Sequence, residues 1–318
     1  MKNLKLGYIG SGSISNFHIP VLKNLKFKIS LFYSRNYDKA LRFSKKHKIQ
    51  KPEKNFKDFV NKINSVDGIV LSIKTDAVIR HLNLLHPFNK PIFVEKPGAL
   101  KSSDLIKFKK SKNKKIFFLY NRRFYPSILE GKKFIQQSKN CFINLAIPDN
   151  VKNINQFITN GCHVIDILIF YFKNLKILKS YKLKKNIGYF FLMTSKNNDL
   201  ISCVLNWGAP QNFEINICNE KNERLHIKPL EVARLYKGMK QIEPTKFYPI
   251  RSYLPKQILK KKSVDIKTKF KPGFLEQHRE IKKIIKNQNS KILTNLNDAI
   301  KVLNLIEIII KKSSKKFD

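Results

Sequence analysis

A short apolar segment runs into a glycine turn and then into a helical pattern close to the amino terminus. Leu4–Gly10 alternates and is apolar, as a buried first strand should be. Gly10-Ser-Gly12-Ser-Ile-Ser15 follows it, and Phe17–Leu25 can form the next helix. In this order the three segments predict a turn whose backbone N–H groups hold phosphates. Any βα turn can carry two glycines, so the surrounding segments decide how the turn is interpreted.

Strand and helix patterns continue to alternate as far as Tyr120. The expected strands are Lys28–Tyr33, Gly68–Ile73, Pro91–Val94 and Ile116–Tyr120, and the expected helices are Asp38–His47, Asn55–Ile63, Asp76–Leu85 and Ser102–Lys110. This alternation predicts a parallel, doubly wound sheet.

The pattern changes after Tyr120. We expect helices at Ile128–Gln137, Cys162–Phe172, Gly273–Asn287 and Asn297–Lys312, and a strand at Cys141–Ile147. An antiparallel meander is expected from Leu178–Leu183, Gly188–Thr194, Leu200–Asn206, Phe213–Cys218 and Arg224–Ile227. Lys237–Lys269 has three prolines and many charges, and is expected to be mostly loop.

The predicted fold class is therefore α/β. A Rossmann-type doubly wound parallel sheet comes first, followed by an α/β domain with an open, mostly antiparallel sheet. We expect a dinucleotide-binding domain at 1–121 and a second domain at 122–318, with the boundary near Tyr120–Pro126. The length of 318 residues is enough for two domains of about 100–200 residues each.

The composition is strongly basic, with 64 Lys and Arg against 22 Asp and Glu and a formal charge of +42. Such a charge can indicate nucleic-acid or membrane-surface binding. The lysines, however, run from Lys2 to Lys316 without forming one basic arm, which favours ordinary surface positions. We therefore expect no nucleic-acid or membrane partner, while the positive field favours small anionic substrates.

Four cysteines without Cys-x-x-Cys spacing predict reduced, structural thiols and no metal site. No charge-free apolar run reaches the roughly 18 residues that a membrane span needs. The amino terminus lacks a signal-peptide layout. We expect a cytoplasmic protein.

The end of the second expected strand indicates which dinucleotide binds. NAD enzymes place Asp or Glu there for the ribose 2′-OH, about 20 residues past the glycines. This chain has Ser34-Arg35-Asn36 and no carboxylate before Asp38. An arginine can face a 2′-phosphate instead, so we predict NADP, with NAD as the alternative if Arg35 is only a solvated turn residue or stacks on adenine.

Further candidates lie where other strands end, because strand ends line the ligand crevice of an open α/β sheet. Glu95-Lys96-Pro97 ends a strand about 80 residues after the glycines. The candidate cofactor contacts are Gly10, Gly12, Ser13, Ile14, Ser34, Arg35, Asn36, Ser72, Thr75, Glu95, Lys96 and Asn121.

Three later segments complete a set of motifs. They are Tyr120-Asn121-Arg122-Arg123-Phe124, Gly161-Cys-His163-Val-Ile-Asp166 and Lys271-Pro-Gly-Phe-Leu-Glu-Gln277. With the glycine turn and Glu95-Lys96-Pro97, their order resembles that of the Gfo/Idh/MocA family, the NAD(P)-dependent sugar and inositol oxidoreductases. The resemblance covers roughly Leu4 to Gln277.

The resemblance implies hydride transfer between a nicotinamide and a hydroxyl or keto carbon of a sugar or nucleotide sugar. It implies Lys96 and His163 as catalytic residues. It also implies that 122–318 is a substrate-binding and oligomerisation domain, and that the protein is a homo-oligomer, a dimer or tetramer. Candidate substrate contacts are Arg122, Arg123, Tyr125, Thr159 and Asp166. Because His163 and Asp166 share a helix face, Asp166 can orient the imidazole.

One position departs from the family pattern. Many members carry Asp four residues before this histidine, and here the residue is Thr159. Threonine cannot relay a proton at neutral pH, so activity rests on Lys96 and His163 alone, or is slow, or is absent. A non-catalytic NAD(P)-binding regulator or scaffold is therefore an alternative, and His163 is then a satisfied core histidine.

Overall fold

The computed structural model describes residues 4–111, 113, 115–149, 157–183, 187–262 and 270–313. The chain forms two compact units. The first comprises Met1–Phe124, Phe157–Asp166 and Asp265–Glu307, and the second comprises Tyr125–Gln156, Ile167–Val264 and Ile308–Asp318. The cofactor and substrate roles expected for 1–121 and 122–318 stay predictions.

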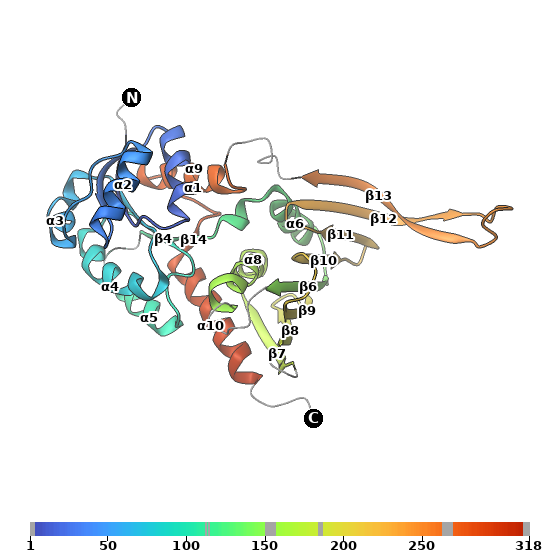
Figure 1. The fold of residues 1–318 in the computed structure, drawn as a ribbon. Helices are drawn as coiled ribbons and strands as arrows, with labels where there is room; N and C mark the ends of the chain where they lie inside the picture. Colours follow the sequence, from blue (N-terminus) through green and yellow to red (C-terminus); the bar gives the residue numbers. More distant parts are fainter. Residues whose placement is uncertain are drawn as a thin grey trace. The chain divides into compact units, whose positions relative to one another are not determined.

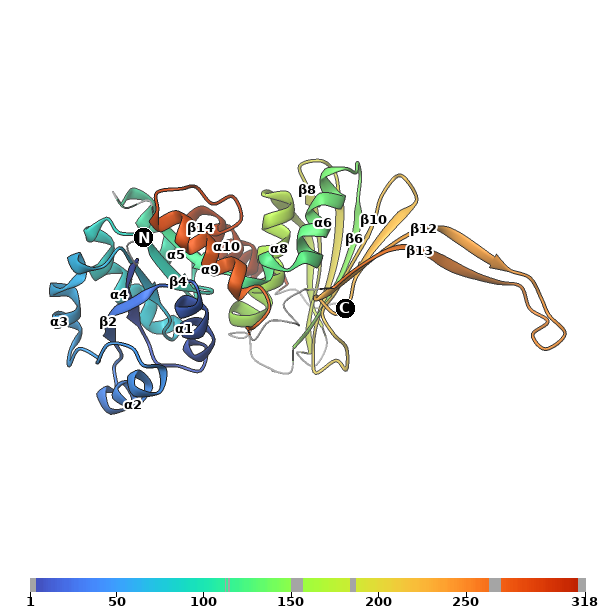
Figure 2. The ribbon, with the colours of Figure 1, turned by 90° about the horizontal axis from the view of Figure 1, so that it is seen from above.

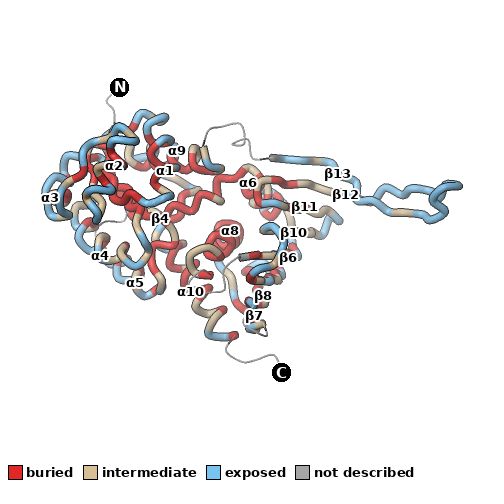
Figure 3. Tube along the Cα trace, viewed as in Figure 1, coloured by how far each residue is buried: buried red, intermediate tan, exposed pale blue. Residues whose placement is uncertain are grey.

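The first unit contains a six-stranded sheet in the order β14-β5-β4-β3-β1-β2. Its strands are β1 (Lys5–Ile9), β2 (Lys28–Tyr33), β3 (Gly68–Leu71), β4 (Ile92–Glu95), β5 (Ile116–Leu119) and β14 (Thr294–Asn295). All pairs are parallel except β14 with β5. Every residue of β3 and β4 is buried, as in a sheet covered on both faces (Figure 1, Figure 3).

The strand order places the ligand crevice. The chain moves outward in one direction from β1 to β2 and in the other from β3 to β5, so the order reverses between β1 and β3. Ligands of open α/β sheets bind outside the carboxyl ends of the strands at such a reversal. The glycine turn follows β1, and Ser72 follows β3.

Asparagine side chains cap two of the helices in the first unit. The unit contains the helices α1 (Ser15–Asn24), α2 (Tyr37–His47), α3 (Phe56–Asn61), α4 (Thr75–Leu85), α5 (Ser102–Ile106) and α9 (Phe274–Ile285), with short turns at Ile63–Ser65, His86–Phe88, Lys107–Lys110 and Asn121–Phe124. The side chains of Asn36 and Asn55 cap α2 and α3 by accepting from the N–H groups of Lys39 and Asp58.

Two apolar helices run from the first unit into the second. A π-helical turn (Phe157–Gly161) leads into α8 (Cys162–Phe172), in which every residue except the half-buried Phe172 is buried. In α10 (Leu296–Lys312) an apolar stripe is buried at Ala299, Val302, Leu303, Ile306 and Ile309, while Ile310 is half-buried.

The second unit contains an eight-stranded sheet in the order β13-β12-β11-β10-β6-β9-β8-β7. Its elements are α6 (Pro126–Gln136), β6 (Phe142–Asp149), β7 (Leu175–Lys182), β8 (Gly188–Ser195), β9 (Leu200–Trp207), β10 (Glu214–Cys218), β11 (Glu223–Ile227), β12 (Val232–Ile242) and β13 (Ser252–Lys262). Only β6 and β9 pair in parallel, so the predicted α/β class with a mostly antiparallel second sheet is confirmed.

The expected single meander is wrong in one respect. Strand β6 lies between β9 and β10, so the five strands do not form one continuous series of neighbours. Strand β6 precedes α8 in the chain, and alternation along a strand does not tell which strand becomes its neighbour.

The expected loop at Lys237–Lys269 is also wrong where the chain is described. Strands β12 and β13 form an antiparallel hairpin that extends past β11 (Figure 2). Pro255 is tolerated because β13 is the edge strand, and Pro244 and Pro249 lie in the connection. Both faces of the far part of the hairpin are exposed, so it lacks the apolar alternation that marks a strand (Figure 3). Residues 263–269 lie outside the described part.

Cys141, Cys162 and Cys203 are buried free thiols, and Cys218 is half-buried. Among the described residues, no helix is long and apolar enough to cross a membrane. The same part of the chain holds no cluster of three or more His, Cys, Asp or Glu side chains suited to a metal.

Candidate active site

The turn after β1 requires glycine at its first position. Gly10 has φ +116°, and a Cβ atom there would lie 1.9 Å from the carbonyl oxygen of Ser72. The N–H of Gly10 donates to the carbonyl of Tyr33 at 2.9 Å. The turn is therefore held against β3 on one side and β2 on the other, as the sequence pattern predicts.

The backbone from Gly12 to Ile14 is arranged to receive an anion. A Cβ atom at Gly12 would meet nothing within 4 Å, so this backbone faces open space. Within the described residues, the N–H groups of Gly12, Ser13 and Ile14 donate no hydrogen bond, and no side chain caps α1. These donors stand at the positive end of a ten-residue helix, which suits the pyrophosphate of a dinucleotide.

Ser15 occupies the position where dinucleotide-binding turns of this kind usually have glycine or alanine. Its hydroxyl group is not left without a hydrogen-bond partner. Ser15 is fully buried, and its Oγ lies 3.1 Å from Ser72 Oγ and 3.4 Å from the carbonyl oxygen of Gly10. Ser72 is thus part of the support of the turn. Thr75, a few residues later, begins α4.

The carboxyl end of β2 presents Arg35 to solvent. Ser34 Oγ lies 2.9 Å from Ser11 Oγ, while Asn36 Oδ1 caps α2. Arg35 is exposed, and the first carboxylate after it, Asp38, lies within the first turn of α2. The local sequence therefore leaves a guanidinium, and no carboxylate, at the end of this strand.

The first prediction compares the two glycines of this turn. Gly10→Ala should lower the free energy of unfolding by about 1–3 kcal/mol. It forces a residue with a side chain into a left-handed backbone conformation, with the Cβ atom against the carbonyl of Ser72. Gly12→Ala should leave stability within about 0.5 kcal/mol and weaken NADPH binding about tenfold, since its methyl group occupies the open side. Chemical denaturation and NADPH titration measure the two effects, and equal effects of both variants would contradict the assignment.

Two buried histidines that the motifs did not include lie behind Glu95. His18 Nε2 is 2.7 Å from Glu95 Oε1, and His18 Nδ1 is 2.9 Å from Nε2 of His278. His278 Nδ1 in turn donates to the carbonyl of Phe274 at 2.6 Å. His18 and His278 are 260 positions apart, so local sequence reasoning had no signal for their contact.

The partners fix where the protons lie. A carbonyl only accepts, so His278 carries its proton on Nδ1 and accepts at Nε2. His18 must therefore donate from Nδ1, and one proton remains between His18 Nε2 and Glu95. Whichever of the two holds it, the pair His18–Glu95 carries no net charge. Burial, and next the nearby His18, lower the pKa of His278 well below its usual value, consistent with a neutral ring.

The two residues predicted to be catalytic, Lys96 and His163, lie near each other. Lys96, which follows β4, donates from Nζ to the carbonyl oxygen of Thr159 at 2.7 Å. Burial, and then the charges of Lys96, Arg122 and Lys271, lower the pKa of His163 well below its usual value. His163 is 6% exposed, and its Nδ1 has no hydrogen-bond partner among the described residues. The imidazole is therefore neutral at neutral pH, and one of its ring nitrogens can accept a hydrogen bond.

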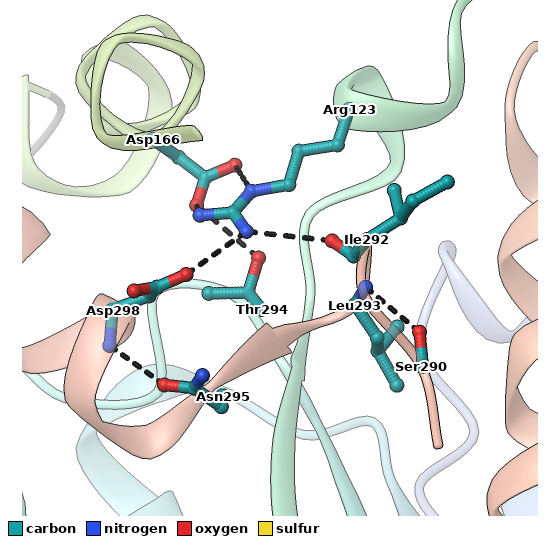
Figure 4. Close-up of polar contacts among 8 residues, drawn as sticks. All are labelled: Arg123, Asp166, Ser290, Ile292, Leu293, Thr294, Asn295 and Asp298. Atoms are coloured by element: carbon teal, nitrogen blue, oxygen red, sulfur yellow. Dashed lines mark hydrogen bonds and ion pairs between the residues drawn. The ribbon is translucent and has the colours of Figure 1, made fainter. Parts of the chain in front are cut away.

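Asp166 does not orient His163, contrary to expectation. Its carboxylate accepts from Arg123 Nε at 2.8 Å and Nη2 at 2.7 Å, and from Thr294 Oγ1 at 3.2 Å (Figure 4). Arg123 Nη1 also donates to Asp298 at 3.1 Å and to the carbonyl of Ile292 at 3.3 Å. We interpret Arg123 and Asp166 as structural, because both are fully buried and bound to each other.

In this cluster one guanidinium is paired with two carboxylates. Burial alone would lower the pKa of Arg123, but Asp166 and Asp298 outweigh it and the pKa is raised. Burial raises the pKa of Asp166 to about 6 against the opposing effect of Arg123, so the carboxylate is still ionised at pH 7. Removing one partner would leave the other as an uncompensated buried charge.

The second prediction compares a buried arginine with an exposed one. Arg123→Met should lower the free energy of unfolding at pH 7 by about 3–5 kcal/mol, because it strands the Asp166 carboxylate. Arg279→Met removes an equal charge from an exposed pair with Glu276 and should cost at most about 1 kcal/mol. Urea unfolding of the two variants makes the comparison, and similar losses would show that Arg123 is no anchor.

The third prediction follows from the lowered pKa of His163. The unfolded chain binds a proton at this residue below about pH 6.5, whereas the folded chain does not. Stability should therefore fall as pH drops below 6.5, by up to about 1.4 kcal/mol per pH unit from this residue. His163→Asn should flatten the measured curve of unfolding free energy between pH 6.5 and 5 by that slope. Parallel curves would mean that His163 titrates normally.

Asn121 and Tyr125, two further candidates from the sequence, are both buried and lie in different units. Asn121 is buried, and its Nδ2 donates to the carbonyl of Pro272 at 2.9 Å, which joins the segment after β5 to the one before α9. Tyr125 is buried and belongs to the second unit, where it precedes α6. The first unit thus brings together Glu95, Lys96, Arg122, Thr159 and His163, while Tyr125 lies outside it.

A hollow of about 540 Å³ lies elsewhere on the first unit, lined by Lys23, Phe27, Lys28, Ile29 and Lys48 among others. Lys28 begins β2, so the hollow is at the amino end of that strand. Cofactor crevices of open α/β sheets lie at the carboxyl ends, and we therefore do not assign this hollow to the candidate site.

No protein-family model matches the sequence, and no curated protein matches it with statistical significance. Solved structures do match. A dehydrogenase (MviM) from Clostridium difficile is 21% identical, with 98% of this chain and 99% of that chain covered and a TM-score of 0.76.

Two further matches have informative names. UDP-N-acetylglucosamine 3-dehydrogenase GnnA from Acidithiobacillus ferrooxidans is 11% identical, covers 97% of both chains and has a TM-score of 0.76. The WlbA dehydrogenase from Bordetella pertussis, in complex with NADH and UDP-GlcNAcA, is 14% identical, with 98% and 96% covered and a TM-score of 0.76. The chain therefore has the fold of the Gfo/Idh/MocA-type oxidoreductases, and the resemblance is confirmed at the level of the fold.

Proposed function

We propose that the protein is an NAD(P)-dependent oxidoreductase acting on a hydroxyl or keto carbon of a sugar or nucleotide sugar. The observation that carries the proposal is the neutral His163 in the electrostatic field of the Lys96 ammonium, at the carboxyl end of the sheet that also bears the glycine turn. Such a pair can move a proton and stabilise negative charge on the same substrate oxygen.

The residues after β1 and β2 fit a nicotinamide dinucleotide. The free N–H groups of Gly12, Ser13 and Ile14 would hold its pyrophosphate, and Arg35 would hold a 2′-phosphate, which favours NADPH over NADH. Ser34, Asn36, Ser72, Thr75, Glu95 and Asn121 are the further proposed contacts. When bound, the nicotinamide supplies or accepts the hydride at its C4.

Side chains of this protein transfer the proton of the substrate hydroxyl and stabilise the negative charge on its oxygen. Lys96 has three ammonium donors, one of which goes to the carbonyl of Thr159, so two can reach the substrate oxygen. Lys96 thereby stabilises the negative charge that develops there, and His163 takes the hydroxyl proton in oxidation or returns it in reduction.

The nature of the substrate draws on the comparisons. GnnA is named as a UDP-N-acetylglucosamine 3-dehydrogenase, and WlbA is bound to UDP-GlcNAcA, which favours nucleotide sugars. Arg122 and Thr159, both in the first unit, are the proposed substrate contacts. We also propose a cytoplasmic homo-oligomer, as expected from the sequence.

One observation favours the non-catalytic alternative. Lys96 donates to the backbone carbonyl of Thr159. At this position many members of the resembled family have an aspartate, whose side-chain carboxylate this chain lacks. A protein that binds NADPH through the glycine turn and transfers no hydride would be a regulator or scaffold.

The fourth prediction tests the role of Lys96. Lys96→Met should lower turnover about a hundredfold or more and change NADPH affinity little, because its charge acts at the reacting oxygen. Lys101→Met, an exposed lysine of the same unit, is the matched control and should leave both unchanged. Steady-state kinetics and NADPH titration give the two quantities. Near-normal turnover of Lys96→Met would make Lys96 a structural strand-end residue.

A further inference from the structure

Three cations gather around His163 from distant parts of the sequence. Lys96 follows β4, Arg122 lies in the turn after β5, and Lys271 precedes α9. We call these three residues the cationic cluster. All three contribute to the lowered pKa of His163, after its burial. Burial lowers the pKa of Lys271, which Glu95 opposes and the charges of Lys96 and Arg122 reinforce, so the cations also act on one another.

Two nearby carboxylates are engaged by other side chains. Glu95 is hydrogen-bonded to His18 at 2.7 Å, and Asp166 is held by Arg123. Within the described residues, neither Lys96 nor Lys271 forms an ion pair with a carboxylate. Lys96 instead donates to Thr159, and the Lys271 ammonium lies 5.2 Å and 5.5 Å from the ring centres of Phe17 and Phe274.

A polar atom without a partner lies in the same place. His163 Nδ1 is buried and makes no hydrogen bond to the described residues, although a neutral imidazole has one donor and one acceptor. Like charges gathered around a buried ring repel one another, and an oxyanion would relieve that repulsion. Ammonium, guanidinium and imidazole donors together match the oxygens of a carboxylate or phosphate.

The phosphates of a cofactor have other places to bind. The pyrophosphate belongs at the turn after β1, and a 2′-phosphate belongs near Arg35 at the end of β2. Strand β4 is separated from β1 by β3, so Lys96 lies two strands away from that turn. Lys271 lies nearer to it, with its ammonium 5.2 Å from the ring centre of Phe17 in α1, and the test below therefore uses protein saturated with NADPH.

We propose that the cationic cluster binds an acid group, a carboxylate or a phosphate, on the sugar that reacts. The inference rests on the proposed function and deepens it: the substrate is an acidic sugar whose charged group lies near the reacting carbon. Lys96 then has two roles, since it contacts both the acid group and the reacting oxygen. Lys271 contacts the acid group and not the reacting oxygen, so it determines the specificity for acidic over neutral sugars.

The test uses NADPH-saturated protein with ¹³C-labelled histidine and three probes, D-glucuronate, D-glucose 6-phosphate and D-glucose. Titration should shift the His163 ring signals saturably with the acids and not with glucose. Comparing the two acids distinguishes a carboxylate site from a phosphate site. Lys271→Gln should weaken binding of the preferred acid about tenfold or more, the usual effect of losing one charge-assisted contact. Lys291→Gln, an exposed lysine of the same unit, is the charge-matched control and should bind normally.

Three results would overturn the inference: no saturable binding of either acid, equal binding of glucose, or equal effects of Lys271→Gln and Lys291→Gln. Failure of the proposed function has a different signature. Saturable acid binding that depends on Lys271, without hydride transfer to or from any sugar, would remove the proposed reaction and keep the anion site. Hydride transfer that is as fast with neutral sugars as with their acids would keep the reaction and remove the anion site.

Discussion

The buried ion pair between Arg123 and Asp166 is the interaction on which the candidate site depends. One guanidinium joins three segments: the turn after β5, the start of α8, and the stretch from Ile292 to Asp298 (Figure 4). Arg122 and His163 lie next to these anchors in the chain, one residue before Arg123 and three before Asp166. A fully bonded guanidinium with two carboxylates satisfies charges that would otherwise be very unfavourable when buried. The position of the catalytic candidates is thus set by residues that do not take part in the chemistry.

The same ion pair decides the electrostatics. Because Asp166 is engaged by Arg123, and Glu95 by His18, neither of these carboxylates is available to stabilise a protonated His163. Burial and the neighbouring cations then keep the imidazole neutral. A neutral histidine, an ammonium and a guanidinium together form the site for which we propose anion binding. The glycine turn at the opposite side of the β1–β3 reversal supplies the complementary site for a dinucleotide.

Local signals in the sequence predicted the fold class and the glycine turn, because the periodicity of strands and helices and the residue types of turns can be recognised in short segments. Gly10 is required by one contact with Ser72, and the motif identified it without knowledge of that contact. Long-range pairing was beyond such signals. The His18–His278 contact joins residues with no shared motif, β6 enters its sheet from before α8, and the exposed β12–β13 hairpin lacks the alternation of a buried strand. The shared face of His163 and Asp166 was real, but Arg123 competes more strongly for the carboxylate than the imidazole does.

The central claim is that the strand ends of the first unit carry out hydride transfer, and isotope transfer tests it most directly. NADPH deuterated at both C4 positions would be incubated with the protein and a panel of keto sugars, nucleotide-linked and free, with and without an acid group. Mass spectrometry of the products then counts the deuterium atoms that each sugar gains. The account predicts one deuterium on the carbinol carbon per turnover, with acidic sugars preferred. Saturable NADPH binding without deuterium in any sugar would contradict it and identify the protein as a non-catalytic NADPH-binding protein.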